Sequence, residues 1–375
     1  MPVDLPEPTP AEREHSDTLA AFIRNEIAAN GPLPFSRFME LAMYAPGLGY
    51  YSAGKTKFGA DGDFVTAPEL GNLFARCVAR AVAPTLRELG ADAQMLELGG
   101  GSGAFAVDCL RELASLDALP ARYALLEPSA DLRQRQRERL QAQPSEIASR
   151  AVWIDRPPED DWHGVLFANE VLDALPATRF SLRDGEVFEE HVIDADGGFA
   201  SIDLPADGFA ANAVRHIERD LGHGLADGYR SEVLPQLPYW IQAVCGGLQR
   251  GMALFVDYGY ARREYYRDER RDGTLIAMYR HRAHADVFAR VGLQDLTAFV
   301  DFSALAEAGT GAGFRIAGLG TQADFLLANG LDEVFAAAYA AAPDEAARYH
   351  LAQEVKRLTL PAEMGETFKV MAFER

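Results

Sequence analysis

Short apolar runs alternate with segments of helical periodicity through the middle of the chain. After the apolar run 95–98, Phe105, Cys109 and Leu113 recur at the spacing of one face of a helix. The five apolar runs cover 95–98, 123–127, 151–155, 164–170 and 252–259. Strands that alternate with helices in this way are typical of a parallel sheet covered by helices. The pattern therefore predicts an α/β fold with a doubly wound, Rossmann-like sheet.

The segments on either side of this pattern predict an extension and an insertion. Before the first run, we expect a disordered leader over 1–15 and helices over 17–29 and 34–44, the second capped by Ser36, and a helix over 69–89. After the fourth run, residues 179–193 alternate around Asp184-Gly185, which indicates a hairpin. A helix over 232–248 and strands over 296–302, 314–319 and 368–373 complete the expected elements.

These elements predict two domains. Residues 1–90 form an N-terminal helical extension with a loop, 49–69, that covers a ligand. Residues 91–375 form the Rossmann-like domain, and its insertion 176–230 serves substrate docking or dimerisation.

Composition narrows the classes of partner. The 36 Lys and Arg residues face 56 Asp and Glu residues, and a net charge of -20 argues against binding to nucleic acid or to an anionic membrane surface. Three widely spaced cysteines form no Cys-x-x-Cys pair, and we expect no metal site. No apolar run reaches the length of a membrane span, and the N-terminus resembles neither a signal nor a transit peptide. We expect a cytoplasmic protein without membrane insertion.

A glycine-rich turn follows the first predicted strand. Glycines there let the backbone adopt positive φ and let a ligand approach the start of the next helix. The pattern Gly99-x-Gly101-x-x-Ala104 fits the dinucleotide fingerprint. However, Glu97 precedes it on the strand, and Glu97-x-Gly99-x-Gly101-x-Gly103 resembles motif I of S-adenosylmethionine-dependent methyltransferases. A carboxylate also suits a ligand with an ammonium and a sulfonium better than a pyrophosphate, so a methyl donor is favoured over a dinucleotide.

Polar residues follow two further predicted strands at their carboxyl ends, where open α/β sheets bind ligands. Glu127 ends the second strand and is placed to accept hydrogen bonds from a ribose diol. Asn169, Glu170 and Asp173 follow the fourth strand and are candidates for catalysis. The alternative for these three is a helix N-cap whose acids are favoured by the helix dipole.

Ten motifs occur in the order in which they occur in one family. Together they resemble the MidA family of S-adenosylmethionine-dependent methyltransferases, over roughly residues 35–373. In chain order, the ten motifs are Phe38-Met39, Tyr44-x-Pro46-x-x-Gly49-Tyr50-Tyr51, Gly62-Asp63-Phe64-x-Thr66-Ala67-Pro68-Glu69, Glu97-Leu98-Gly99-x-Gly101-x-Gly103, Glu127-x-Ser129, Ala168-Asn169-Glu170-x-x-Asp173-Ala174-x-Pro176, Asp257-Tyr258-Gly259, Gly273-Thr274, Asp295-x-Thr297-x-x-Val300-Asp301-Phe302 and Met364-Gly365-x-x-Phe368-Lys369.

The resemblance implies a class I methyltransferase fold with S-adenosyl-L-methionine as cofactor. It also implies an arginine on a protein acceptor, because mitochondrial members of the family are protein-arginine methyltransferases that act in respiratory complex I assembly. A homodimer is a further expectation, with the insertion 176–230 as the segment that would mediate it if it does not dock the substrate. The residues expected to hold the cofactor are Thr66, Pro68, Glu97, Gly99, Gly101, Gly103, Glu127, Ser129 and Asn169.

For catalysis we expect carboxylates to orient a guanidinium and to accept its proton. Glu170 and Asp173 are the first candidates, followed by Asp63 and Asp257. An alternative function is a non-catalytic assembly protein on a methyltransferase fold. A dinucleotide oxidoreductase is a more distant alternative, because no residue suggests a base for nicotinamide chemistry.

Overall fold

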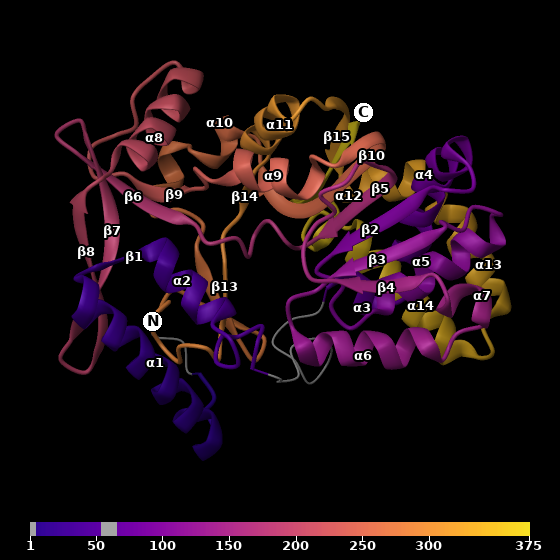
Figure 1. Cartoon of the computed structure of the whole chain (residues 1–375), viewed down its shortest axis with the longest axis horizontal. Coiled ribbons are helices and arrows are strands. Elements are labelled where there is room, and N and C mark those ends of the chain that lie inside the picture. Colours follow the sequence, from indigo (N-terminus) through magenta and orange to yellow (C-terminus); the bar gives the residue numbers. More distant parts are fainter. Residues whose placement is uncertain (1–4, 54–65) are drawn as a thin grey trace. The chain divides into compact units, whose positions relative to one another are not determined.

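The chain folds into two compact units, each built from three segments. The computed structural model describes residues 5–53 and 66–375 (Figure 1). Unit 1 takes its residues from Met1–Phe64, Leu172–Leu237 and Tyr260–Ser303, and unit 2 from Val65–Val171, Pro238–Gly259 and Ala304–Arg375.

Unit 2 is organised around a mostly parallel sheet with the strand order β15-β16-β10-β5-β2-β3-β4. Neighbouring strands from β10 to β4 are parallel, whereas β16 is antiparallel to both β10 and β15. The strands are β2 (Gln94–Leu98), β3 (Arg122–Leu126), β4 (Ala151–Ile154), β5 (Trp162–Asn169), β10 (Leu248–Tyr260), β15 (Arg315–Thr321) and β16 (Phe368–Glu374). The predicted α/β fold with a doubly wound sheet is confirmed.

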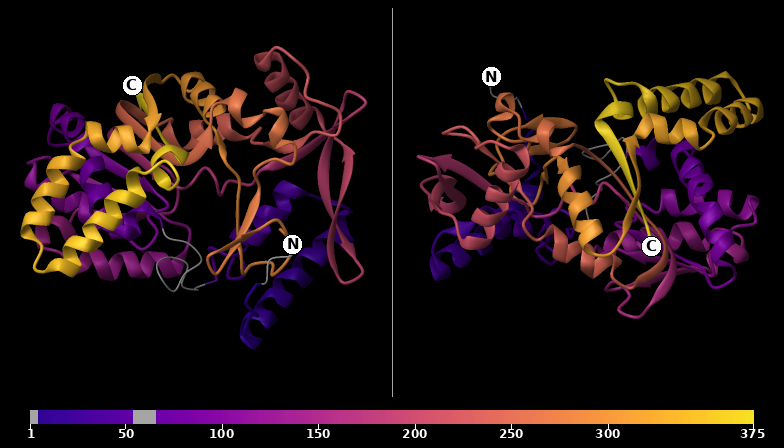
Figure 2. Two further views of the ribbon diagram at one scale, coloured as in Figure 1. Left: turned by 180° about the vertical axis from the view of Figure 1, so that it is seen from behind. Right: turned by 90° about the horizontal axis from the view of Figure 1, so that it is seen from above.

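Helices cover this sheet because its strands are apolar on both faces. In β2, Met95 shares the core with α4 and α5, and the buried Leu96 and Leu98 alternate with it on the other face. Figure 2 shows α13 and α14 in yellow alongside the indigo-to-magenta elements of the same unit. The helices are α3 (Ala67–Leu70), α4 (Leu73–Leu89), α5 (Ala104–Ser115), α6 (Ala130–Gln141), α7 (Ser145–Ala148), α9 (Leu237–Cys245), α11 (Phe302–Gly311), α12 (Gln322–Ala328), α13 (Leu331–Ala341), α14 (Glu345–Thr359) and α15 (Met364–Thr367). Within the part of the chain that the structure describes, no helix is long and apolar enough to cross a bilayer.

Unit 1 contains an antiparallel sheet in the order β1-β7-β6-β9, with β8 paired to β7, and a small sheet in the order β12-β11-β13. The first sheet consists of β1 (Leu33–Pro34), β6 (Thr178–Arg183), β7 (Glu186–Ala195), β8 (Gly198–Pro205) and β9 (Arg230–Val233). The other elements are α1 (Pro10–Asn30), α2 (Phe35–Tyr44), α8 (Gly208–Leu221), α10 (Arg262–Tyr265), a 3-10 turn (Asp268–Arg270), β11 (Ile276–Tyr279), β12 (Arg282–His284), β13 (Asp295–Thr297) and β14 (Val300–Asp301).

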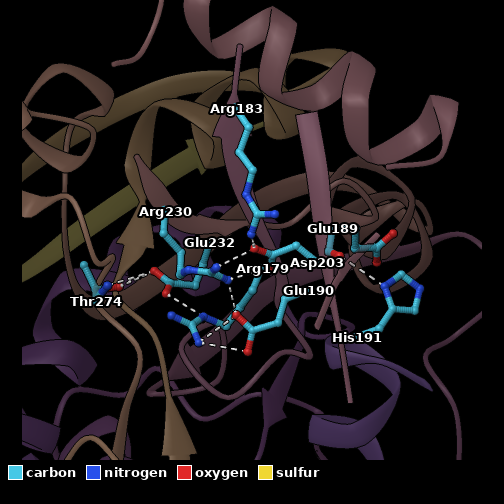
Figure 3. Close-up of polar contacts among 9 residues, drawn as sticks. All are labelled: Arg179, Arg183, Glu189, Glu190, His191, Asp203, Arg230, Glu232 and Thr274. Atoms are coloured by element: carbon cyan, nitrogen blue, oxygen red, sulfur yellow. Dashed lines mark hydrogen bonds and ion pairs between the residues drawn. The ribbon is translucent and has the colours of Figure 1, made fainter. Parts of the chain in front are cut away.

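A buried ion-pair network joins the strands of the larger sheet of unit 1 (Figure 3). It combines the three guanidinium groups of Arg179, Arg183 and Arg230 with three carboxylates, which are Glu190, Asp203 and Glu232. Arg230 binds Asp203 in a bidentate pair at 3.0 and 2.7 Å, and Arg179 binds Glu190 at 3.1 Å. We call these six residues the arginine network. Its three positive charges balance its three negative charges, which offsets the cost of burying the carboxylates.

Glu232 extends the arginine network to the loop before β11. Its carboxylate accepts hydrogen bonds from the backbone N–H of Thr274 at 2.8 Å and from the Thr274 hydroxyl at 3.3 Å. A Cβ on Gly273, which has φ of 78°, would lie 2.2 Å from the carboxylate, so only glycine fits there. Contact with the buried carboxylate of Glu232 therefore explains why the motif Gly273-Thr274 has these two residue types.

Three expectations for local structure are wrong. Residues 10–15 are helical, because Thr9 and Glu12 form a reciprocal capping box that starts α1 at Pro10. Pro34, rather than Ser36, is the N-cap of α2, and it makes no side-chain cap bond. The segment 232–248 divides into the end of β9, α9 and the start of β10, since Pro238 sits in the first turn of α9 and Glu232 is held on its strand. The hairpin around Asp184-Gly185 is confirmed as β6 and β7.

Candidate active site

The carboxyl ends of the parallel strands of unit 2 lie side by side. Leu98 of β2 pairs with Leu126 of β3 and with Ala168 of β5, while Val256 of β10 pairs with Asn169. The residues that follow these positions therefore share one edge of the sheet. The strand order reverses between β2 and β5, and a ligand crevice forms at such a switch point in open α/β sheets.

The glycine-rich turn after β2 has the backbone that the sequence predicts. Gly99, Gly101 and Gly103 have φ of 63°, 51° and 79°, in the left-handed region that side chains rarely adopt. A Cβ on Gly99 would lie 3.1 Å from the Val171 side chain, and one on Gly103 would lie 3.2 Å from Cα of Gln136. The turn therefore needs glycine for its conformation and for its close neighbours, and it leads into the N-terminus of α5, whose N-cap is Gly103.

Glu127 at the end of β3 is held by a set of neutral donors. Its Oε1 accepts a hydrogen bond from the Ser129 N–H at 3.0 Å, and its Oε2 accepts one from the Gln136 amide at 3.3 Å. Ser129 is also the N-cap of α6, because its hydroxyl accepts from the Leu132 N–H. Ser129 and Glu127 are therefore adjacent at the strand end.

Gln136 is a site residue that the sequence analysis missed. It is fully buried, and its amide nitrogen also donates to the Gly101 carbonyl at 2.9 Å. Its amide oxygen accepts from the Trp153 indole N–H at 2.9 Å. One side chain thus fixes the glycine turn, Glu127 and the end of β4. A glutamine among the charged residues of α6 gives no sequence signal, although its helical distance of seven residues from Ser129 places both on one face.

Glu97 lies under the turn, in the interior of unit 2. Its side chain is 3% exposed, and its carboxyl group accepts a hydrogen bond from the Tyr123 hydroxyl at 2.8 Å. Burial raises its pKa from 4.5 to about 8, against the opposing effect of the Tyr123 hydrogen bond. At neutral pH this group is therefore largely protonated, and its predicted contact with the cofactor stays a prediction.

Glu170 occupies a strained position directly after β5. Its φ is 53°, a left-handed conformation that is uncommon for residues other than glycine and that often marks functional sites. Its backbone N–H donates to the Val256 carbonyl of β10 at 2.9 Å, and its Oε1 accepts from the Asn169 amide at 2.9 Å. The backbone and Asn169 together fix the direction of this half-buried carboxylate. It is followed by Val171, the neighbour of Gly99.

Asp257 lies one residue beyond the Val256–Asn169 pair on β10. It is 1% exposed, and its Oδ1 accepts from the Tyr258 N–H at 2.9 Å. It therefore belongs to the same edge of the sheet as Glu170, but deeper in the protein.

The segment before α4 contacts the glycine turn. The Ser102 hydroxyl donates to the Glu69 carboxylate and accepts from Arg139 of α6 at 3.0 Å. Thr66 is the N-cap residue of α3, without a side-chain cap bond, and Pro68 lies in the first turn of that helix. Glu69 therefore ties the predicted cofactor residues Thr66 and Pro68 to the glycine turn.

Two predicted catalytic residues are not part of the described edge of the unit 2 sheet. Asp63 falls outside the described residues. Asp173 belongs to unit 1, where it is 6% exposed and its carbonyl accepts from the Ala298 N–H at 3.0 Å. Over residues 5–53 and 66–375, no three His, Cys, Asp or Glu side chains gather as a metal site would require.

The comparison with protein families decides between the two ligand classes. Residues 77–320 match the family of putative S-adenosyl-L-methionine-dependent methyltransferases. The chain belongs to this family. A protein from Burkholderia thailandensis, whose crystal structure contains S-adenosyl-homocysteine, is 44% identical, covers 99% of this chain and 95% of its own, and superposes with a TM-score of 0.92.

Curated relatives are more distant. The mitochondrial protein arginine methyltransferase NDUFAF7 of Rattus norvegicus is 26% identical over 97% of this chain and 86% of its own length. The NDUFAF7 homologue of Drosophila melanogaster is 28% identical over 80% of this chain and 72% of its own length. The resemblance to the MidA family is confirmed, and the protein is an S-adenosylmethionine-dependent methyltransferase of class I fold.

The described site fits this cofactor. The glycine turn leads directly into the N-terminus of α5, where a helix favours a ligand, and Glu127 offers carboxylate oxygens at the position where such folds bind a ribose. We expect the turn, Glu127 and Ser129 to hold S-adenosylmethionine, with Asn169 and Glu170 at the next strand end.

Proposed function

We propose that this methyltransferase transfers a methyl group to an arginine nitrogen of a protein acceptor. The observation that supports this most is the similarity, along 80–97% of the chain, to relatives named protein arginine methyltransferases. By the resemblance to the MidA family, the acceptor is a subunit or an assembly intermediate of respiratory complex I. The net charge of -20 agrees with a basic protein segment as partner.

The chemistry of arginine explains why carboxylates are needed. A guanidinium has a pKa above about 12, so it arrives as a cation and has to lose a proton when its nitrogen forms a bond to carbon. S-adenosylmethionine supplies the methyl group, which its sulfonium releases. The protein has to orient the guanidinium plane and accept the proton.

Glu170 is the residue best placed for both tasks. The Asn169 amide holds its Oε1, and the strained backbone directs the carboxylate from the strand end that adjoins the glycine turn. Positioning of this kind contributes up to roughly 7–11 kcal/mol to lowering a barrier. Asp173 and Asp257 are further carboxylates of the proposed acceptor chemistry.

The test is a transfer assay with identification of the product. Purified protein, S-adenosylmethionine with a deuterated methyl group and isolated complex I assembly intermediates are incubated, and labelled residues are located by mass spectrometry. We expect labelled arginine, and none with Glu170→Gln. Binding of S-adenosyl-homocysteine without transfer to any protein would instead support a non-catalytic assembly role, and label on another residue type would refute arginine.

A further inference from the structure

Unit 1 holds a second group of side chains from the family motifs, which the donor site does not use. Tyr44 ends α2, Tyr51 follows it after a turn, and Asp295 lies on β13. The two tyrosine rings are stacked, with centroids 5.6 Å apart and planes at 18°. The Tyr51 hydroxyl donates to Asp295 Oδ2 at 3.5 Å, and the Tyr44 hydroxyl donates to the Ala174 carbonyl at 2.9 Å. We call these two tyrosines, with Asp173 and Asp295, the Tyr–Asp cluster.

The cluster concentrates negative charge in a sheltered place. Asp295 is 3% exposed and Asp173 is 6% exposed. Burial, and then the charge of Asp295 with smaller effects of Tyr44 and Asp173, raises the pKa of Tyr51 well above its usual value of 10. The backbone places Asp173 beside β13, because its carbonyl accepts from the Ala298 N–H at 3.0 Å, one residue after Thr297. Two carboxylates around one pair of tyrosines favour a cation.

The stacked rings suit one kind of cation. A guanidinium is planar, stacks on aromatic faces and binds carboxylates through two parallel N–H donors. An ammonium has the same charge but no plane to stack. The combination of two aromatic rings with two carboxylates therefore matches arginine better than lysine.

Thr297 gives an independent sign of a ligand. It is 4% exposed, and its hydroxyl has no hydrogen-bond partner among the residues that the structure describes. Thr297 and Asp295 are two residues apart on β13, so their side chains point to the same face of the strand. A buried hydroxyl without a partner is costly in a folded protein, and a polar ligand at the cluster would satisfy it.

We propose that the Tyr–Asp cluster and Thr297 bind the cationic side chain of the acceptor, with Asp295 and Asp173 pairing with a guanidinium and Tyr44 and Tyr51 contacting its plane. This inference rests on the proposed function, because it assigns side chains that recognise the protein acceptor of that reaction. It adds Tyr44, Tyr51, Asp295 and Thr297 to the residues that would bind an arginine of that acceptor.

The test uses the full chain saturated with S-adenosyl-homocysteine and tyrosines labelled with 13C in the ring. The probes are N-acetyl-arginine amide, its neutral isostere N-acetyl-citrulline amide and N-acetyl-lysine amide. Tyr44→Phe and Tyr51→Phe assign the signals. We expect the arginine probe to shift the signals of both tyrosines and the citrulline probe to leave them unchanged. Equal shifts with arginine and citrulline, or no shift with either cation, would overturn the cluster as a cation site.

Variants separate binding from folding. Thr297→Val replaces an unpartnered hydroxyl by a methyl group, so we expect an unchanged or higher Tm together with several-fold weaker binding of the arginine probe. Asp295→Asn should weaken that binding at least tenfold while S-adenosyl-homocysteine binds as in the parent. Asp194 is an exposed acid of β7 that pairs with Arg24, so Asp194→Asn is the matched control. It should change neither the binding of the arginine probe nor the binding of S-adenosyl-homocysteine.

If Asp295→Asn does not fold, Tyr51→Phe replaces it as the test variant. This variant retains the ring, and the same two binding measurements compare it with the parent. A Thr297→Val variant that binds arginine like the parent contradicts the role of the hydroxyl.

The outcomes for the cluster and for the arginine proposal can be told apart. If the lysine probe binds more tightly than the arginine probe and labelled lysine is the product, the cation site stands and arginine is the wrong acceptor. If labelled arginine forms while neither tyrosine signal responds to arginine, the proposed function stands and the cluster does not hold the acceptor.

Discussion

The donor end of the unit 2 sheet and the arginine network of unit 1 treat buried carboxylates in opposite ways. At the donor end, Glu97, Glu127 and Glu170 accept hydrogen bonds from a tyrosine hydroxyl and from two side-chain amides. In the arginine network, Glu190 and Asp203 are paired with guanidinium groups.

The difference shows what each region is built to do. At Glu127 and Glu170 a neutral donor fixes the direction of a carboxylate without cancelling its charge, so the group can still act on a ligand, whereas burial raises the pKa of Glu97 to about 8. An arginine cancels the charge and links strands, which stabilises the sheet once both partners are buried. Four predictions test this contrast.

The largest effect is expected for Glu170→Gln. The amide keeps the shape of the side chain but can neither accept a proton nor pair with a guanidinium. Transfer should fall roughly a thousandfold, equivalent to about 4 kcal/mol in the barrier, while the affinity for S-adenosyl-homocysteine changes less than about twofold. Activity and calorimetric titration measure the two quantities. Glu159→Gln, an exposed acid, is the control. An equal loss of binding and transfer would refute the catalytic role.

The next effect concerns stability, through Arg230→Met. Removing this guanidinium leaves Glu190 paired with Arg179 alone and Asp203 paired with the half-exposed Arg183 alone, although the two acidic side chains are only 2% and 4% exposed. Loss of one partner from a buried pair costs about 3–5 kcal/mol, and the partial exposure of Arg230 puts this change near the lower end. Chemical denaturation measures it. Arg24→Met breaks an exposed pair and should cost less than about 1 kcal/mol. Equal effects of both variants would show that burial does not set the cost.

A pH dependence separates Glu97 from the arginine network. The folded pKa of about 8 lies above the unfolded value of 4.5, so the folded chain binds more protons in this range and the free energy of unfolding falls as pH rises. Glu97→Gln removes that slope. The variant should match the parent near pH 5 and exceed its stability by roughly 3 kcal/mol at pH 8.

Denaturation at several pH values checks this prediction. Glu354, whose pKa burial raises to about 7, titrates in both proteins and cancels in the difference. A stability difference that does not depend on pH would show that Glu97 does not titrate as a buried acid.

The smallest effect is expected for Glu127→Gln. Gln keeps an acceptor for the Ser129 N–H but weakens hydrogen bonds from a ribose diol, because it loses the charge. The affinity for S-adenosyl-homocysteine should fall about tenfold, or about 1.4 kcal/mol. Calorimetric titration measures this change, with the exposed Glu146→Gln as control. A parent-like affinity would place the cofactor ribose elsewhere.

Much of unit 2 was predictable from the sequence because its signals are local. Buried parallel strands appear as apolar runs, and a turn with positive φ at Gly99, Gly101 and Gly103 requires glycine at those places. The same local logic predicted the hairpin at Asp184-Gly185. It misjudged the start of α1, where Thr9 and Glu12 cap the helix ahead of its apolar stripe.

Other features depend on residues that are far apart in the chain. Gln136 joins Gly101, Glu127 and Trp153, and Glu232 holds the loop at Thr274. The sequence around Gln136 or Glu232 does not distinguish it from a solvent-exposed polar residue, because the partners of each come from other elements.

The sequence by itself determined the α/β fold, the glycine turn and, through its motifs, the family and its cofactor. These follow from the periodicity of apolar residues and from backbone conformations that few residue types allow. The tertiary structure decided which polar groups meet: the strained Glu170 beside Asn169, the buried Glu97 against Tyr123, and Tyr51 against Asp295. Hydrogen bonds and charges act over a few ångströms in space, and only the folded chain brings these residues within that range.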